Sequence, residues 1–600
     1  MRRAVVRTAR VRFGSRVALA LAVTTATVAV EPARAQPRPR ARTVMLSVVG
    51  TNDLHGHVEA LPVFAGYLAN LRRARRAGGG VVLVDGGDMF QGTLESNLGE
   101  GSPVVRAYNA LGYTAAAIGN HEFDYGPVGE AATPQAASDD PRGALRARAR
   151  EARFPVLAAN LLDGATGRPV DWDNVHPSTL ARVGGVRVGV IGVTTAETLT
   201  TTIAANVRGL RIAPLADTIR AEAERLRARG AGVVIVAAHA GGVCHRFDAP
   251  ADLSSCAPNE EIFAVARALP PGLVDVIVAG HTHARVAHVV NGIAIIESHA
   301  TGIAFGRVDL TVDRQTGRVV TAEVRPPRDM CARPEGTCEP GVYEGAPVVP
   351  DAAMQRLLAP AFERARELRD APLGVRAQAR IQRSYGVESA LGNLFADLMR
   401  TARPEASVAM TNGGGLRADL PEGELTYGAL FEAMPFDNHF ALVNMRGDEL
   451  ARVVARNLSS DSGILSLSGV RATATCEGRR VVVQLARDDG RPVRADEQLV
   501  VATSDFIATG GDSVFASLAR RPGAITVDEA GPTIRDGMAN VLRQRRGTLT
   551  PTETFDPRQR RIVYPGRRPL RCGPPNPAPS PPPSPPPATP TVSPPSPPPS

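Results

Sequence analysis

The chain has 600 residues, too many for one hydrophobic core, so two folded domains with appendages are expected. The hydrophobic fraction of 43% and the charged fraction of 22% are those of an ordinary globular protein. The formal charge of +9 drops to +3 once residues 1–35, with seven Arg and one Glu, are set aside. This balance does not indicate a nucleic-acid polymer as a partner.

Residues 1–35 have the three parts of an export signal. A basic stretch from Arg2 to Arg16 precedes an apolar stretch from Val17 to Val30, and Ala33-Arg34-Ala35 is a small-residue cleavage site. The apolar stretch of 14 residues is shorter than the roughly 20 that span a bilayer, which disfavours a transmembrane anchor. The chain contains no Lys, which we interpret as the codon usage of a GC-rich bacterium. We therefore expect an exported bacterial protein, either periplasmic or secreted.

Strand-like runs alternate with helical stretches such as Ala216–Arg229 from Thr43 to about Arg325. This alternation predicts an α/β layered domain over residues 43–345. Each strand-like run ends in a polar turn. The runs and their turns are Val44–Val49 before Asp53 and His55, Val81–Val84 before Asp88, Ala115–Ile118 before Asn120, Val233–Ala238 before His239, and Val274–Ala279 before His281 and His283.

The remaining residues predict a linker, a second domain and a tail. The segment Asp351–Arg369 is rich in Ala, Leu, Arg and Glu, so residues 346–370 are expected to form a linker helix with Pro360 near its middle. Residues 371–565 mix helical and strand-like patterns and predict a second α/β domain. Residues 573–600 are almost entirely Pro, Ser, Thr and Ala, a composition that cannot form a core and predicts a disordered tail.

Six cysteines are an even number, which in an exported chain indicates disulfides. Two pairs are close enough in sequence to bridge local loops, and the remaining two cysteines are left for each other. This connectivity is one choice among fifteen. The favoured pairs are Cys244–Cys256, Cys331–Cys338 and Cys476–Cys572.

The polar turns after the five runs supply Asp, Asn and His. Each side chain would lie at the carboxyl end of a strand, and in an open α/β sheet these ends line the ligand crevice. The mixed nitrogen and oxygen donors, without a thiolate, suit Zn, Mn, Co or Fe more than Ca. Seven such ligands suit two divalent ions about 3.5–4 Å apart, which can hold the attacking and departing oxygens of a phosphoryl transfer. One D-x-H or H-x-H pair is a weak indication, but five turns in order are a strong one.

The same motifs carry a family resemblance. D-x-H, G-G-D, G-N-H-E, a strand-terminal His and G-H-x-H resemble the calcineurin-like metallophosphoesterase superfamily. The strings T-N-D-L-H-G-H and G-N-H-E-F-D-Y-G look like its 5'-nucleotidase and UDP-sugar hydrolase branch. Over residues 43–565 the resemblance implies a layered β-sandwich flanked by helices, a linker helix and a second mixed α/β domain.

The resemblance also implies a role for each ligand. His121 and Asp124 resemble the family's catalytic dyad, in which the carboxylate orients the imidazole. His121 would stabilise charge on the phosphoryl or leaving oxygen while hydroxide activated by the metals attacks phosphorus. Some relatives have Gln at the position of His283, a change that would alter metal preference. One ion would be held by Asp53, His55, Asp88 and His283, and the other by Asp88, Asn120, His239 and His281. No metal role is expected for His57, His245, His288 and His299.

The second domain resembles the nucleotide-specificity domain of the same family. Its motifs are N-G-G-G-L-R, P-F-D-N and F-I-A-T-G-G-D, in which glycines admit a ligand close to the backbone and Arg can grip a phosphate. The resemblance implies two Phe that stack a base and an Asp that binds ribose. Relatives offer further Arg near the start of this domain, where this chain has Arg383 in an uncertain register. The expected substrate-binding residues are Asn412, Arg417, Phe436, Asn438, Phe506, Asp512 and Arg383.

We therefore expect an exported phosphohydrolase with two metal ions that acts on nucleoside 5'-monophosphates. Two other activities share the metal domain: 2',3'-cyclic nucleotide phosphodiesterase with 3'-nucleotidase, and UDP-sugar hydrolysis. A non-catalytic surface-binding protein is disfavoured by the complete ligand set and the His121–Asp124 pair. The oligomeric state is left open.

Overall fold

The computed structural model describes residues 42–129, 131–332, 338–515, 521–529 and 531–573. The expected export signal lies outside these residues, as does the expected tail apart from Gly573. Within the described residues, the helices are all too short or too polar to cross a membrane.

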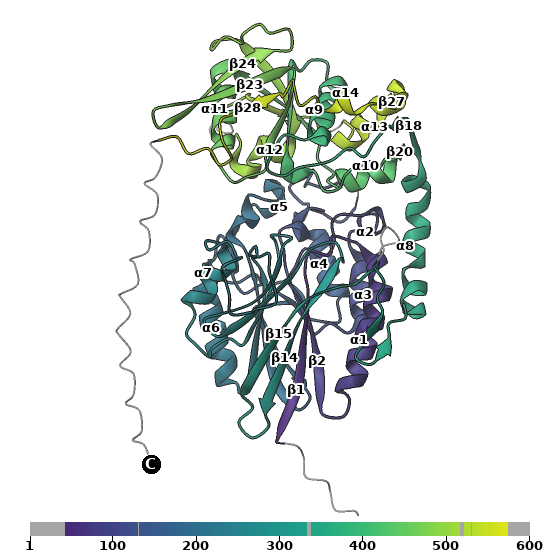
Figure 1. The fold of residues 1–600 in the computed structure, drawn as a ribbon, viewed down its shortest axis with the longest axis vertical. Coiled ribbons are helices and arrows are strands. Elements are labelled where there is room, and N and C mark those ends of the chain that lie inside the picture. Colours follow the sequence, from purple (N-terminus) through teal and green to yellow (C-terminus); the bar gives the residue numbers. More distant parts are fainter. Residues whose placement is uncertain (1–41, 130, 333–337, 516–520, 530, 574–600) are drawn as a thin grey trace, which may run out of the picture. The chain divides into compact units, whose positions relative to one another are not determined.

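Two large β-sheets dominate the first part of the structure (Figure 1). The seven-stranded sheet has the order β15 (Val319–Asp329), β14 (Ala304–Asp313), β1 (Thr43–Thr51), β2 (Gly79–Asp85), β3 (Ala115–Ala117), β4 (Val156–Leu157) and β6 (Val175–His176). The six-stranded sheet has the order β12 (Arg285–Val290), β13 (Ile293–Ser298), β11 (Val276–Ala279), β10 (Val233–His239), β8 (Val186–Thr194) and β7 (Ser178–Val183).

Small β-branched side chains fill the space between the sheets. Val48, Val84 and Ile235 belong to this layer and are fully buried, and β10 is buried along its whole length. Such near-continuous apolar strands are typical of parallel sheets covered on both faces. The expected layered sandwich is therefore confirmed.

Helices cover the outer faces of the two sheets (Figure 1). The helices packed on the seven-stranded sheet include α1 (Leu61–Arg75), α3 (Ser102–Leu111) and α4 (Gly143–Glu151). Those on the six-stranded sheet are α6 (Leu215–Ala228) and α7 (Glu261–Ala268). The shorter elements are η1 (Val58–Ala60), α2 (Leu94–Asn97), η2 (His121–Phe123), β5 (Leu161–Asp163), η3 (Ala196–Leu199), α5 (Ala204–Val207) and β9 (Leu210–Ile212).

Helix α8 (Ala352–Asp370) connects the two parts of the fold. Asp351 caps its first turn by accepting from Met354 N at 2.7 Å, and the helix continues through Pro360. Its buried residues recur at helical spacing along one face. The six residues before α8 are not helical, because a hairpin of β16 (Val342–Tyr343) and β17 (Ala346–Pro347) crosses the expected boundary at residue 345.

The second part contains three smaller sheets. Their orders are β20 (Gly423–Thr426), β18 (Pro372–Ala377) and β27 (Gly547–Leu549); β22 (Leu465–Ser468), β19 (Val408–Asn412), β25 (Gln498–Ser504), β21 (Phe440–Arg446) and β26 (Ile525–Val527); and β24 (Arg480–Arg487), β23 (Val470–Glu477) and β28 (Ile562–Val563). The helices are α9 (Ala390–Ala402), η4 (Gly413–Gly415), α10 (Tyr427–Ala433), α11 (Gly447–Leu458), α12 (Asp505–Thr509), η5 (Gly511–Ser513), α13 (Ile534–Arg545) and α14 (Pro551–Thr554). This part has its own hydrophobic cores, as a separate α/β domain requires.

All six cysteines are paired in disulfides, and the pairing is the one favoured from the sequence. The bridges are Cys244–Cys256, Cys331–Cys338 and Cys476–Cys572.

Candidate active site

The seven expected ligands lie at the carboxyl ends of β1, β2, β3, β10 and β11. Strands β1 and β2 run parallel with Thr51 opposite Asp85, and β10 and β11 run parallel with Ala238 opposite Ala279, so the turns after them share an edge of each sheet. His239 is the last residue of β10 itself and does not lie in the turn after it. Five of the seven have positive φ angles, a backbone conformation that clusters at functional sites. These are Asp53 (50°), His55 (49°), Asp88 (58°), His281 (82°) and His283 (55°).

One cluster combines residues from three of these turns. The ligand atoms of Asp53, His55, Asp88 and His283 all lie within 4.8 Å of one another. Nε2 of His55 is 2.9 Å from Nε2 of His283, and Nε2 of His283 is 3.5 Å from Oδ1 of Asp53. Two carboxylates and two imidazoles therefore converge on one point.

A second cluster lies beside the first and shares Asp88 with it. His239 Nε2 is 3.2 Å from Asp88 Oδ2 and 2.9 Å from Asn120 Oδ1. His281 Nδ1 is 3.1 Å from the same Asn120 oxygen. Asp88 Oδ2 is also 3.8 Å from His55 Nε2, so a single carboxylate oxygen faces both clusters.

The protonation pattern of two histidines fits a pair of cations. Nδ1 of His55 lies 2.8 Å from the carbonyl of Gln91, and Nδ1 of His239 lies 3.0 Å from the carbonyl of Gly86. A carbonyl only accepts, so Nδ1 carries a proton in both rings, and Nε2 is the nitrogen that faces the cluster. In metal sites, the ring nitrogen that does not bind the metal usually donates to a carbonyl or carboxylate, and this hydrogen bond fixes the orientation of the imidazole. The residues therefore fit two divalent ions.

Glu122 holds two of the ligand turns in place. Its buried carboxylate accepts from the backbone N–H groups of Asp88 (2.9 Å), Met89 (2.7 Å) and Gly119 (2.6 Å). Burial, together with the charge of Asp88, raises the pKa of Glu122 to about 8, although the N–H donors oppose this shift. The G-N-H-E motif thus supplies a support for the turn after β2 as well as its own turn.

Glu297 supports the turn that carries His281 and His283. This buried residue of β13 contacts Thr282 Oγ1 at 2.6 Å and accepts from Gly242 N at 3.0 Å. Burial raises its pKa well above the ordinary value. Thr282 Oγ1 also donates to the carbonyl of Gly242 at 3.0 Å, which ties the turn after β11 to the turn after β10.

His121 and Asp124 form the pair expected from the sequence. His121 Nδ1 is 2.6 Å from Asp124 Oδ2, and Thr202 Oγ1 donates to the other carboxylate oxygen at 2.7 Å. Burial alone would lower the pKa of His121, but Asp124 and then Asp88 raise it above its ordinary value. The pair is therefore arranged to hold a proton on an oriented imidazole.

A cavity of about 960 Å³ opens over the clusters and contains both kinds of expected residue. Asp53 and His239 are fully buried behind its wall. The expected residues that line it are His55, Asp88, Asn120, His121, Asp124, His281 and His283 from the first part, and Arg383, Asn412, Arg417, Phe436, Asn438, Phe506 and Asp512 from the second.

Two side chains of the second part contact histidines of the first. Arg417 Nη2 lies 3.0 Å from His55 Nε2, and the Phe436 ring centre is 5.5 Å from that of His121. Elsewhere in the cavity, Asn412 donates to Asp512 Oδ2 at 2.5 Å. Arg383 donates to the carbonyl of Leu416 at 3.2 Å, beside Arg417 in sequence.

Comparison with known proteins agrees with this geometry. The calcineurin-like phosphoesterase family model matches residues 46–285, and the 5'-nucleotidase C-terminal domain model matches residues 368–520. The chain belongs to the family of calcineurin-like phosphoesterases with a 5'-nucleotidase C-terminal domain. It is a metal-dependent phosphoester hydrolase, which argues against the non-catalytic alternative.

Individual relatives support the family assignment. The chain is similar to protein UshA of Yersinia enterocolitica, with 28% identity over 511 residues, 78% of this chain and 86% of that protein. It is similar to a 5'-nucleotidase of Vibrio cholerae, with 25% identity over 523 residues, 81% of this chain and 88% of that protein. The fold matches a 5'-nucleotidase precursor from Thermus thermophilus with a TM-score of 0.68 and 24% identity, over 87% of this chain and 99% of that structure.

Sequence reasoning missed several residues of this phosphoesterase that line or support the cavity. Arg380 lines the cavity, as does Arg383. Glu197 Oε2 lies 3.3 Å from His281 Nε2. Gln91 donates to the carbonyl of Pro435 at 2.8 Å. An isolated Arg, Glu or Gln carries no spacing signal, so only the three-dimensional structure identifies them.

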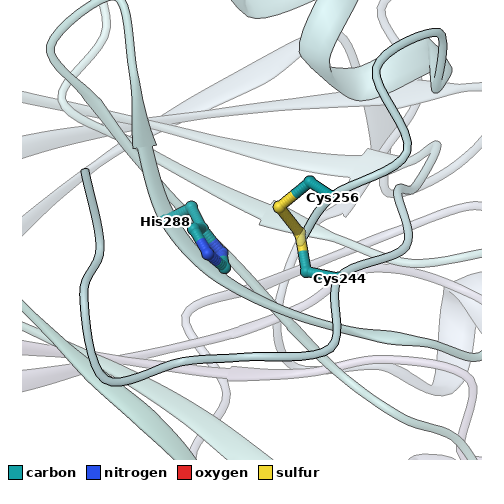
Figure 2. A group of neighbouring side chains, drawn as sticks. All are labelled: Cys244, Cys256 and His288. Carbon is teal, nitrogen blue, oxygen red and sulfur yellow. A yellow bond between two sulfur atoms is a disulfide. The ribbon is translucent and has the colours of Figure 1, made fainter. Parts of the chain in front are cut away.

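A third group of metal-type side chains lies apart from the active site of the enzyme. Sulfur and ring nitrogen atoms of Cys244, Cys256 and His288 lie within 4.8 Å of one another (Figure 2). The two sulfurs are joined in a disulfide and offer no thiolate, which is the form that binds metals. His288 is a fully buried residue beside this disulfide.

Proposed function

We propose that this phosphoesterase is exported and releases phosphate from nucleoside 5'-monophosphates. The observation that carries the proposal is that one cavity is lined both by residues suited to a phosphate and by residues suited to a nucleoside. One wall offers His121, Asp124 and the two clusters that fit metal ions, and the other offers Phe436 and Phe506 with Asp512. A phosphate and a nucleoside of one substrate have matching partners there.

The two ions are of the Zn, Mn, Co or Fe class, as the mixed donors favour. When bound, they supply charge that stabilises the phosphoryl oxygens and lower the pKa of the attacking water. In our proposal one ion is held by Asp53, His55, Asp88 and His283, and the other by Asp88, Asn120, His239 and His281.

The protein side chains then bind, orient and transfer protons. Asp124 accepts from Nδ1 of His121, which leaves Nε2 of that ring to donate to a phosphoryl or leaving oxygen. Arg417, whose Nη2 lies 3.0 Å from His55 Nε2, donates to the phosphate. The base stacks between Phe436 and Phe506, and Asp512 accepts from the ribose hydroxyls, with Arg383, Asn412 and Asn438 as further contacts.

The division of the chain belongs to the same proposal. Residues 1–35 act as the export signal, residues 43–345 form the phosphoesterase domain, residues 346–370 the linker, residues 371–565 the specificity domain, and residues 573–600 the tail. Three disulfides support passage through an oxidising compartment.

Product analysis tests the activity. The purified enzyme, freed of metal by a chelator and reloaded with Mn or Zn, is incubated with AMP, 2',3'-cyclic AMP or UDP-glucose. We expect adenosine and phosphate from AMP at the highest kcat/KM. Turnover of only the cyclic nucleotide, or of only the UDP-sugar, would contradict the 5'-monophosphate assignment and favour the corresponding alternative.

A further inference from the structure

A buried arginine holds the loop that carries Phe436. Arg535 is 4% exposed and stacks 4.2 Å from the Phe431 ring centre. Its guanidinium donates to the Phe436 carbonyl at 3.0 Å and forms an ion pair with Asp437. A guanidinium is planar and donates in fixed directions, so the groups that accept its hydrogen bonds are held in one arrangement. The loop that ends at Asn438 is therefore a rigid part of the cavity wall.

The Asn438 amide is oriented by Asp505. Asn438 Nδ2 lies 2.9 Å from Asp505 Oδ1, and the same oxygen accepts from Phe506 N at 2.7 Å. Burial raises the pKa of Asp505, but Oδ1 already accepts the backbone N–H of Phe506, so a proton on this carboxyl would sit on Oδ2. Asn438 must therefore present its NH2 group to Asp505, and the other edge of the amide is the carbonyl oxygen.

The Asn438 side chain lines the substrate cavity. Asn438 is half-buried and lines the cavity, and within the described part of the chain no group donates to its Oδ1. Asn438 follows Phe436 by two residues, and Asp505 directly precedes Phe506. The backbone N–H of Asp505 also donates to the His439 carbonyl at 2.9 Å, which joins the two loops. The Asn438 amide thus lines the same cavity as the two aromatic residues proposed to stack the base.

We propose that Asp505 locks Asn438 so that its amide oxygen accepts from the exocyclic amine of a nucleobase. The enzyme then selects adenine over hypoxanthine nucleotides and cytosine over uracil nucleotides. An amine donates to the oxygen, whereas the keto group at the same ring position is an acceptor and leaves two acceptors facing each other. This inference rests on the proposed nucleotidase activity.

The test compares substrates that differ at this group. We would measure kcat/KM for AMP, IMP, CMP, UMP and p-nitrophenyl phosphate, which has no base. We expect AMP over IMP and CMP over UMP by about tenfold, the ratio that corresponds to one lost hydrogen bond of about 1.4 kcal/mol. In Asp505→Asn, the new amide can donate or accept, Asn438 is free to turn over, and both ratios fall toward one.

Control substrates and variants distinguish a positioning role of Asp505 from a general loss of activity. Asp505→Asn should erase the preference while the rate on p-nitrophenyl phosphate stays within about twofold. Asp496→Asn, an exposed control, should change neither quantity. Equal kcat/KM for AMP and IMP in the unaltered enzyme, or a preference that survives in Asp505→Asn, would overturn the inference. Hydrolysis of p-nitrophenyl phosphate with no hydrolysis of any nucleotide would instead overturn the proposed function.

Discussion

Arg417 Nη2 lies 3.0 Å from His55 Nε2, although 362 residues separate the two in sequence. Nδ1 of His55 donates its proton to the Gln91 carbonyl, so Nε2 of His55 accepts from Arg417. The same guanidinium lies 5.8 Å from the centre of the Phe436 ring. The second domain thus brings a cation and an aromatic ring directly to the ligand clusters of the first, so a phosphate held at the metals would lie within reach of Arg417.

Arg417→Lys should lower kcat/KM for AMP by about 10–100-fold. Lys keeps the charge but loses the planar fork that can donate two parallel hydrogen bonds to a phosphate. Steady-state kinetics would measure the loss, and metal analysis should find the ion content unchanged. Arg376→Lys, at an exposed position in the same domain, is the matched control. Unchanged kinetics in Arg417→Lys would show that the residue does not touch the substrate.

His121→Asn should lower kcat by about 10²–10⁴-fold, the usual contribution of a positioned general acid. The variant should bind the same number of ions as the unaltered enzyme, because His121 pairs with Asp124 and lies outside both clusters in our proposal. His245→Asn, on an exposed histidine, should keep full activity. Loss of an ion together with the activity would mean that His121 is a ligand and not an acid.

Arg535→Met should destabilise the second domain by about 2 kcal/mol. The substitution keeps an apolar side chain against Phe431 but removes hydrogen bonds from a charged donor to the Met434 and Phe436 carbonyls. Urea unfolding followed by circular dichroism would measure the shift. Arg543→Met lies on the exposed side of the same helix and should change stability little. Equal midpoints for the two variants would contradict the anchoring role of Arg535.

The disulfides should contribute according to the loops they close. Replacing Cys244 and Cys256 by Ser opens a loop with a sequence separation of 12 and should cost about 3 kcal/mol. Replacing Cys476 and Cys572 opens a separation of 96 and should cost about 4.7 kcal/mol. Unfolding of the two double variants tests this order. The first variant should also retain two ions per chain, and loss of an ion would point to a metal at Cys244, Cys256 and His288.

Much of the fold could be predicted from the sequence because strand and turn chemistry is local. The β-branched run Val81–Val84 and the turn with Asp88 became β2 and its following turn. The helix proposed from Asp351 begins at Ala352, with Asp351 as its cap. The ligand-type residues could be named from the sequence because they recur in a fixed order of motifs.

Other features depend on the fold and have no local signal. The roles of Asp505 and Arg535 follow from contacts across 67 and 99 residues, to Asn438 and Phe436 respectively. The placement of Glu297 behind Thr282 requires the pairing of β12 with β13. The hairpin that crosses residue 345 consists of two-residue strands, which are too short to show an alternating pattern.

The central claim is that two ions, bridged by Asp88, act together on a nucleotide phosphate. The most direct test is a stepwise titration of metal-free enzyme with Mn or Zn while phosphate release from AMP is measured, beside Asp88→Asn and the exposed control Asp171→Asn. We predict activity that reaches its plateau at two ions per chain, is absent in Asp88→Asn, and is unchanged in Asp171→Asn. Full activity with one ion per chain, or in Asp88→Asn, would contradict the account.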